Sequence, residues 1–144
     1  MREKINKARK NKKGFSLVEL IVVIAIMAVL VAILAPQFLK YVERSRVSAD
    51  KQNVTEIINA VQAYASDDTT TTFPTGTVTL NIKGTASTAD ANVASALTAA
   101  GLNIGNINLK SQNWGTDKKI TIVFGQDTTT KALTVTVTPT DAAQ

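Results

Sequence analysis

The chain contains neither cysteine nor histidine in its 144 residues. Without cysteine there is no disulfide and no thiolate nucleophile, and without histidine there is no imidazole general base. These two residue types are also the usual ligands of zinc. No serine–lysine pair and no pair of carboxylates stands out as a catalytic constellation. The sequence therefore predicts that the protein is not an enzyme and has no catalytic residues, bound metal or cofactor.

Excess positive charge is missing from most of the chain. Residues 1–14 carry seven Lys or Arg against one acid, Glu3, whereas the remainder carries nine Lys or Arg against ten acids. A basic stretch directly before an apolar run is typical of the cytoplasmic flank of a membrane segment. We expect residues 1–14 to be a leader that is removed on maturation. The mature chain would then be close to neutral, and we expect it not to bind nucleic acid.

Charged and strongly polar side chains are also missing from the sixteen residues 20–35. Glu19 is the ionised group at the edge of this run. A carboxylate in hydrocarbon costs about 3 kcal/mol on insertion scales. We therefore expect Glu19 to have a partner that neutralises it.

A single long helix is predicted over residues 15–66, because the apolar run continues without a turn signal into residues with helical spacing. At 1.5 Å per residue such a helix is about 78 Å long, more than twice the roughly 30 Å of a hydrocarbon core. We expect residues 15–35 to lie in the membrane, and residues 36–66 to project from it and pack on a head. Pro36 removes one helical hydrogen bond and predicts a kink. The apolar stripe of the outer half is Val47, Val54, Ile57, Ile58, Val61, Tyr64 and Ala65.

Residues 67–144 are rich in threonine and alternate between apolar and polar residues, which predicts an antiparallel β head. The strands are centred on residues 78–82, 120–124 and 133–137, with a hairpin between the last two and a possible further strand at 107–109. One short helix is expected between a capping box that begins at Ser87 and a stop at Gly101. The predicted fold class is α+β, with the outer half of the long kinked helix packed on a small antiparallel sheet.

Several smaller features have ordinary explanations. We interpret Asp67, Asp68 and Asp127 as solvated loop residues rather than calcium ligands. Trp114 is expected in the core. The pair Lys118–Lys119 is expected to protect a sheet edge.

The N-terminal residues resemble those of a type IV pilin or a related pseudopilin. Residues 12–20 read Lys-Lys-Gly-Phe-Ser-Leu-Val-Glu-Leu. Together with the basic leader and the apolar helix, they match a class III signal peptide, the prepilin-type N-terminal methylation motif. The specific part of this resemblance covers residues 10–45, and the head is similar in architecture alone.

The resemblance implies a role for four residues. A prepilin peptidase would cut between Gly14 and Phe15 and then methylate the new amino group of Phe15. Glu19 would be the fifth mature residue, where the family keeps a carboxylate that takes part in assembly by pairing with that amino group. Pro36 would be the twenty-second, where the family commonly has a helix-breaking proline. The chain departs from many pilins of Gram-negative bacteria in having no cysteine to close a C-terminal loop.

Three functions stay open at this point. The first is a structural subunit that polymerises through its N-terminal helix into a type IV pilus, a surface filament for adhesion, motility or biofilm formation. The second is a pseudopilin of a type II secretion or DNA-uptake system. The third is a single-pass membrane protein with a ligand-binding head.

The first two functions imply the same partners. These are other copies of the chain in a helical filament, the prepilin peptidase, and a pilus assembly platform with its ATPase. The implied location is the inner or cytoplasmic membrane before assembly and, for a pilus, the extracellular filament afterwards.

Overall fold

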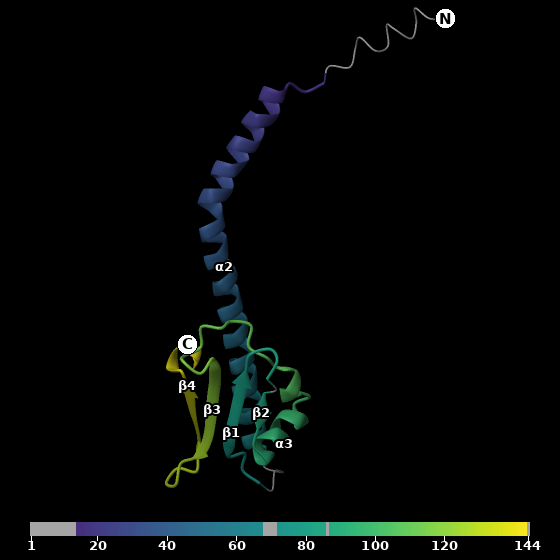
Figure 1. Ribbon diagram of the computed structural model, residues 1–144. Coiled ribbons are helices and arrows are strands. Elements are labelled where there is room, and N and C mark those ends of the chain that lie inside the picture. Colours follow the sequence, from purple (N-terminus) through teal and green to yellow (C-terminus); the bar gives the residue numbers. More distant parts are fainter. Residues whose placement is uncertain (1–13, 68–71, 86, 144) are drawn as a thin grey trace, which may run out of the picture. The chain divides into compact units, whose positions relative to one another are not determined.

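The computed structural model describes residues 14–67, 72–85 and 87–143 (Figure 1). The predicted leader, except for Gly14, lies outside the described residues, as does Asp68. The chain divides into two compact units, residues 1–41 and residues 42–144. The second unit is called the head below.

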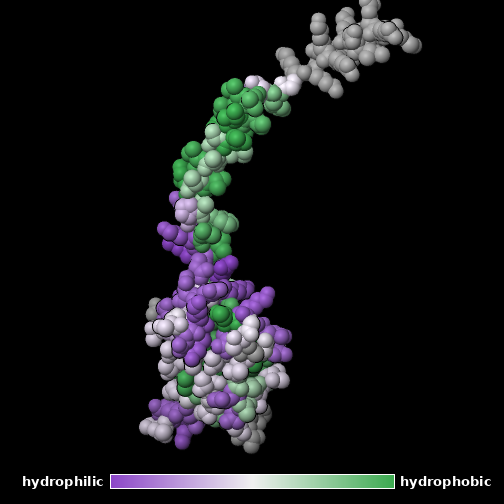
Figure 2. Space-filling model, in the orientation of Figure 1, coloured by the Kyte–Doolittle hydropathy of each residue, from purple (hydrophilic) through white to green (hydrophobic). Residues whose placement is uncertain are grey.

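Helix α2 (Leu17–Ala65) is a single helix of 49 residues with Pro36 inside it. Its first part, through Tyr41, consists of exposed residues, and Figure 2 shows that its visible surface is largely hydrophobic. Its later part supplies Val54, Ile57 and Val61 to the core of the head. Helical secondary structure is unbroken at Pro36, so the kink predicted there stays a prediction.

The head contains one antiparallel sheet of four strands in the order β2-β1-β3-β4. Strand β1 (Gly76–Asn81) pairs with the two-residue strand β2 (Thr88–Ala89) and with β3 (Lys119–Gln126), and β3 pairs with β4 (Leu133–Thr138). The three strands and the hairpin expected from alternation are confirmed. Short 3-10 turns follow the helix α3 (Ala91–Ala99) and strand β4, at Ile104–Asn106 and Thr140–Ala143.

The sheet has one buried face and one face rich in threonine. Because side chains alternate along a strand, the paired residues Val78 and Ile122 face inward while their neighbours Thr79 and Thr121 face outward. The inward face packs with α2 and with the short helix α3 (Ala91–Ala99) in one cluster. The α+β fold, with a long N-terminal helix on an antiparallel sheet and a short extra helix, is therefore confirmed. The fully buried core members of the sheet and α3 are Val78, Leu80, Val93, Ala96, Ile120 and Ile122.

The stop at Gly101 is confirmed, but the capping box at Ser87 is wrong. Gly101 has a φ of +77°, and the N–H of Leu102 donates to the carbonyl of Leu97 at 2.8 Å, which closes the helix end. Ser87 is buried and accepts a hydrogen bond from the N–H of Asn81 at 3.1 Å. The residue at the helix start is Asp90, whose carboxylate accepts instead from the N–H of Thr77 at 2.7 Å.

Two further expectations from the sequence are corrected. Lys119 begins β3, which is an interior strand, and pairs with Asn81 of β1, so Lys118–Lys119 do not protect a sheet edge. Residues 107–109 do not form a strand. Leu109 instead makes an isolated parallel bridge with Ile82.

Candidate functional site

The first candidate site is the start of α2, where Gly14, Phe15, Ser16 and Glu19 lie within five residues of one another. Gly14 is exposed with open space around it, and Phe15 is 94% exposed. Glu19 Oε2 accepts a hydrogen bond from the Ser16 N–H at 2.8 Å, and Ser16 Oγ accepts from the Val18 N–H at 3.3 Å. The pair forms a capping box, which the Ser-x-x-Glu spacing at 16–19 could have revealed and our sequence reasoning missed.

This geometry fixes where the helix begins. Ser16 precedes the first helical residue, Leu17, so the capping contacts start one residue after Phe15. The Glu19 carboxylate lies in the first turn, where it also interacts favourably with the helix dipole. A peptide bond between Gly14 and Phe15 therefore lies in exposed chain without regular secondary structure, just outside a helix that is already capped.

The apolar segment that follows has the length of a membrane span. The twenty residues from Leu17 to Pro36 rise about 30 Å, which matches the hydrocarbon thickness. Its most hydrophobic window has a mean hydropathy of 3.2, and none of that window is buried in the chain. This amount of exposed apolar surface indicates that the segment lies in an apolar environment outside its own chain.

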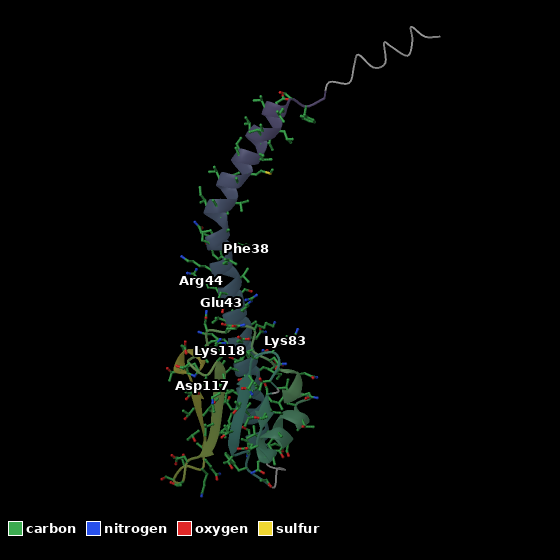
Figure 3. All side chains as sticks on the ribbon, in the orientation of Figure 1. Phe38, Glu43, Arg44, Lys83, Asp117 and Lys118 are labelled. Carbon is green, nitrogen blue, oxygen red and sulfur yellow. The ribbon has the colours of Figure 1, made fainter. Side chains whose placement is uncertain are left out.

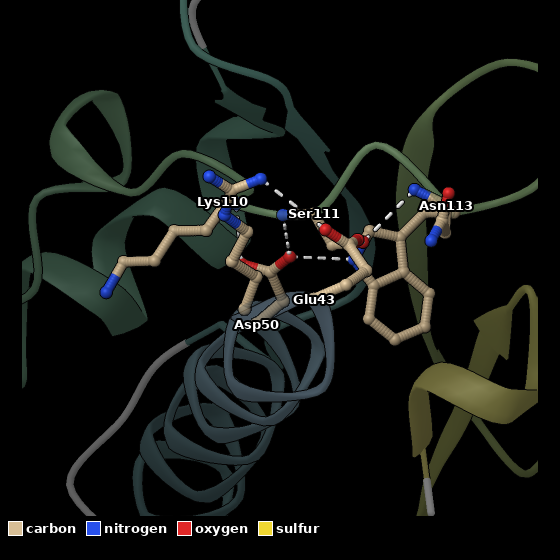
Figure 4. A network of polar contacts seen from close by, with 7 residues as sticks. Glu43, Asp50, Lys110, Ser111 and Asn113 are labelled. Atoms are coloured by element: carbon tan, nitrogen blue, oxygen red, sulfur yellow. Dashed lines mark hydrogen bonds and ion pairs between the residues drawn. The ribbon is translucent and has the colours of Figure 1, made fainter. Parts of the chain in front are cut away.

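A second polar site lies inside the head, and sequence reasoning missed it (Figure 4). Asp50 is not a member of the apolar stripe predicted on this helix, yet its side chain is fully buried. One carboxylate oxygen, Oδ1, accepts from the Lys110 N–H at 2.7 Å. The other, Oδ2, accepts from the Ser111 N–H and from Trp114 Nε1–H, each at 2.8 Å. We call these contacts the Asp50 clamp.

The Asp50 clamp is extended by Glu43, which precedes Asp50 by seven residues on α2. The Ser111 hydroxyl donates to Glu43 Oε1 and accepts from the Asn113 N–H at 3.1 Å. Glu43 Oε2 also pairs with Arg46 at 3.5 Å. Two carboxylates of α2 thus hold the loop 110–114, and Trp114 in that loop is 2% exposed, which confirms the prediction that it belongs to the core.

The Asp50 clamp fixes the loop 110–114 against α2, and its residues form no catalytic arrangement. Its acceptor oxygens are occupied by backbone and indole donors. Among the described residues no group of three or more His, Cys, Asp or Glu side chains could hold a metal ion. Asp127 lies in the loop after β3. Its carboxylate accepts from the N–H groups of Thr130 and Thr129 at 2.7 and 2.8 Å, and these bonds lower the pKa of Asp127 below its usual value.

Comparisons with known proteins agree with the N-terminal geometry. Residues 9–35 match the family model of the prokaryotic N-terminal methylation motif. The chain is 35% identical over 90 residues to the prepilin peptidase-dependent protein A of Clostridium perfringens, which covers 62% of this chain and 61% of that protein. No solved structure matches the chain.

Two pilins match over shorter stretches. The type IV major pilin protein PilA of Myxococcus xanthus is 33% identical over 64 residues, covering 44% of this chain and 29% of that protein. The type IV major fimbrial protein FimA of Dichelobacter nodosus is 36% identical over 56 residues, covering 39% and 36%. The chain thus spans about three-fifths of the first of these relatives and about a third of the other two.

The chain thus carries the prokaryotic N-terminal methylation motif before an exposed apolar helix and an α+β head. It is similar to two type IV pilins and to a prepilin peptidase-dependent protein.

Proposed function

We propose that the chain is the structural subunit of a type IV pilus and that it polymerises through its N-terminal helix into a surface filament. The observation that carries this proposal is the apolar half of α2, whose side chains from Leu17 to Leu39 are exposed and uncharged except for Glu19. In a bilayer this surface contacts lipid, and in a filament it contacts the same segment of other subunits. The two relatives that are named as major pilins support the pilus over other filaments.

Processing begins in the exposed chain before α2. A prepilin peptidase cuts between Gly14 and Phe15 and methylates the new amino group of Phe15. The name of the Clostridium perfringens relative, a prepilin peptidase-dependent protein, supports this step. Because the capping box starts at Ser16, the cut removes the leader without removing a contact that starts the helix.

Assembly then uses the charge that the cut creates. The amino group of Phe15 is a cation at the edge of an apolar segment, and the Glu19 carboxylate is an anion in the same setting. Each is costly alone and much less so when paired. Before a neighbour arrives, Glu19 can retain its bond to the Ser16 N–H. A new subunit can then place its Phe15 amino group against Glu19 of a subunit already at the filament base, where the assembly platform and its ATPase act.

Pro36 contributes flexibility at the end of the apolar segment. Proline has no N–H, so the carbonyl of Ala32 has no partner four residues on. The helix can bend or open there when subunits pack together. Pro36→Ala should restore the bond and slow amide exchange over residues 37–40, and equal exchange at these residues in the two proteins would exclude this role.

A pseudopilin of a secretion or DNA-uptake system is the second candidate, since it would share the motif, the helix and the processing. A single-pass membrane protein with a ligand-binding head is a more distant alternative. The cellular location of the chain depends on which of these three functions it has. All three begin in the inner or cytoplasmic membrane, and the pilus subunit then becomes extracellular.

The test is to find where the processed chain accumulates. Intact mass and N-terminal sequence are measured in membranes and in the fraction sheared from cells. A methylated chain that begins at Phe15 and is abundant in the sheared fraction supports the pilus. The same species confined to membranes favours a pseudopilin, and a chain that still begins at Met1 contradicts both.

Two variants separate processing from assembly. Gly14→Val should block the cut, because a bulky residue replaces the small one before the scissile bond. Glu19→Ala should be cut normally yet reduce filament yield about tenfold or more, since the amino group of Phe15 loses its buried partner. Glu19→Gln keeps a hydrogen-bond acceptor for the Ser16 N–H and serves as the control for capping. Normal filament yield from both Glu19 variants would refute the pairing.

A further inference from the structure

The two ends of the head carry charge of opposite sign. Strand register places Asn81 beside Lys119 at one end of the sheet and Gly76 beside Phe124 at the other. The Leu109 N–H donates to the Asn81 carbonyl at 2.9 Å, so the loop held by the Asp50 clamp belongs to the first end. The last turn of α2 shares a surface hollow with Lys131 and Leu133, which belong to the second end.

The first end is basic. It carries six exposed basic residues against Asp117, Asp141 and the half-buried Glu43. Figure 3 shows Glu43, Arg44, Lys83 and Lys118 gathered there with Asp117. The basic residues of this end, called the basic end below, are Arg44, Arg46, Lys83, Lys110, Lys118 and Lys119.

Part of this positive charge is not neutralised within the head. Arg46 pairs with Glu43 at 3.5 Å and Lys119 pairs with Asp117 at 3.3 Å. Lys83, Lys110 and Lys118 are exposed and form no ion pair with any described residue. The Asp50 clamp fixes the backbone at Lys110, so this surface is held in place rather than carried by a free loop.

The second end is acidic. Asp90 lies there because its carboxylate binds the N–H of Thr77, near the start of β1. Asp127 lies there because it begins the loop after β3, and Asp67 follows the last turn of α2. These three residues, called the acidic end below, are opposed among the described residues of that end by one base, Lys131.

We propose that the basic end of one head binds the acidic end of another copy of the chain. The two surfaces are different and complementary in charge, so the contact joins head to tail. Such a contact leaves one basic end and one acidic end free after each addition, and when its rotation does not close a ring it generates an open helical polymer. The inference rests on the proposed filament function and adds to it a contact between heads, separate from the packing of the apolar helices.

The contact is expected to be sensitive to salt. At physiological ionic strength the Debye length is about 8 Å, so exposed charges act on one another mainly at contact distance. Charge complementarity of this kind sets register and partner choice more than total affinity. The apolar helices would supply most of the affinity, and the charged ends would determine how successive heads meet.

The experiment compares the same substitution at the two ends, in the full chain in cells that assemble filaments. Lys110→Glu lies at the basic end and Lys131→Glu at the acidic end. Both variants change the net charge equally, because each replaces a lysine by a glutamate. Lys110→Glu, and more strongly Lys83→Glu with Lys110→Glu, should lower the yield of sheared filaments, by about fivefold or more for the double variant. Lys131→Glu should leave the yield unchanged or raised, because it makes the acidic end more acidic.

A compensating variant tests whether the two ends meet. Thr128→Lys and Thr129→Lys add positive charge to the exposed hairpin of the acidic end. The two threonine side chains form no hydrogen bond with any described residue, and the Thr129 bond to Asp127 comes from its backbone N–H. Mixed in one cell with the Lys83→Glu, Lys110→Glu chain, this variant should restore at least half of the lost yield. Circular dichroism of each purified chain and the mass of its processed form verify folding and cleavage.

The outcomes separate the contact between heads from the filament itself. Absence of filaments from the unmodified chain would contradict the proposed function. Filaments from the unmodified chain with equal yields from Lys110→Glu and Lys131→Glu would overturn only the contact between heads. Equal filament yields together with weaker retention of the Lys83→Glu, Lys110→Glu chain in bilayers of anionic lipid would also overturn it, and would assign the basic end to lipid phosphates.

Discussion

The two halves of helix α2 are built for different neighbours. Residues 17–41 expose every apolar side chain, whereas residues 42–65 bury Asp50, Val54, Ile57 and Val61 in the head. The outer half, residues 42–65, thus packs on a fixed partner within its own chain. Its buried carboxylate, Asp50, also accepts hydrogen bonds from three donors in that partner. The apolar half has a chemically uniform surface without such individual contacts. A uniform surface suits an element that exchanges lipid for protein, because it requires no particular polar partner in either setting.

The largest expected effect comes from breaking the Asp50 clamp. Asp50→Ala leaves the N–H groups of Lys110 and Ser111 and the Trp114 indole N–H buried without an acceptor. Each such donor costs about 1–3 kcal/mol, and we expect the free energy of unfolding of the head to fall by about 3–5 kcal/mol. Urea unfolding of the full chain in detergent, followed by circular dichroism, measures this change.

A milder variant distinguishes the clamp from general packing. Asp50→Asn keeps the shape and one acceptor oxygen, so it should lose roughly half as much stability as Asp50→Ala. A loss below about 1 kcal/mol for Asp50→Ala would mean that the loop 110–114 finds other partners and that the head does not depend on this carboxylate.

A matched pair of truncations tests the contrast between the two halves of α2. Ile57→Ala opens a cavity in the core of the head and should cost about 2–4 kcal/mol of unfolding free energy. Ile24→Ala removes the same atoms from the exposed half and should change the stability of the isolated subunit by less than about 0.5 kcal/mol. Its effect should appear instead as lower filament yield. Equal losses of head stability from the two variants would contradict the division.

The smallest expected effect concerns Asp127 in the hairpin loop. Because the N–H groups of Thr130 and Thr129 lower the pKa of Asp127 in the folded state, the ionised form contributes stability above its unfolded pKa of about 3.9. This contribution is lost as the pH falls through the lower folded-state pKa. We expect NMR titration to show the Asp127 carboxyl titrating below the usual range, and Asp127→Ala to speed amide exchange at Thr129 and Thr130. A carboxyl that titrates normally would contradict the two hydrogen bonds.

The sequence predicted the features that have a local or periodic cause. Alternation of Val78, Leu80 and their threonine neighbours identified a strand, and Gly101 identified a helix end, because in both cases the decisive residues are adjacent in the chain. The Asp50 clamp could not be found in this way, since its donors lie 60 to 64 residues away and are mainly backbone groups. Ser87 failed for a similar reason. Its hydroxyl serves the loop at Asn81 and Ile107 rather than its own helix.

The burial of Trp114 has a consequence for durability. Both methionines of the chain, Met1 and Met27, precede the head, and the chain has no cysteine or histidine, so the head contains no sulfur atom and no imidazole. Its one tryptophan is enclosed beneath Asp50. Peroxide and hypochlorous acid attack sulfur first among protein side chains, and here they would meet a face made largely of threonine. Methionine sulfoxide and the oxidised forms of cysteine therefore cannot arise in the head, and its tryptophan is shielded by burial.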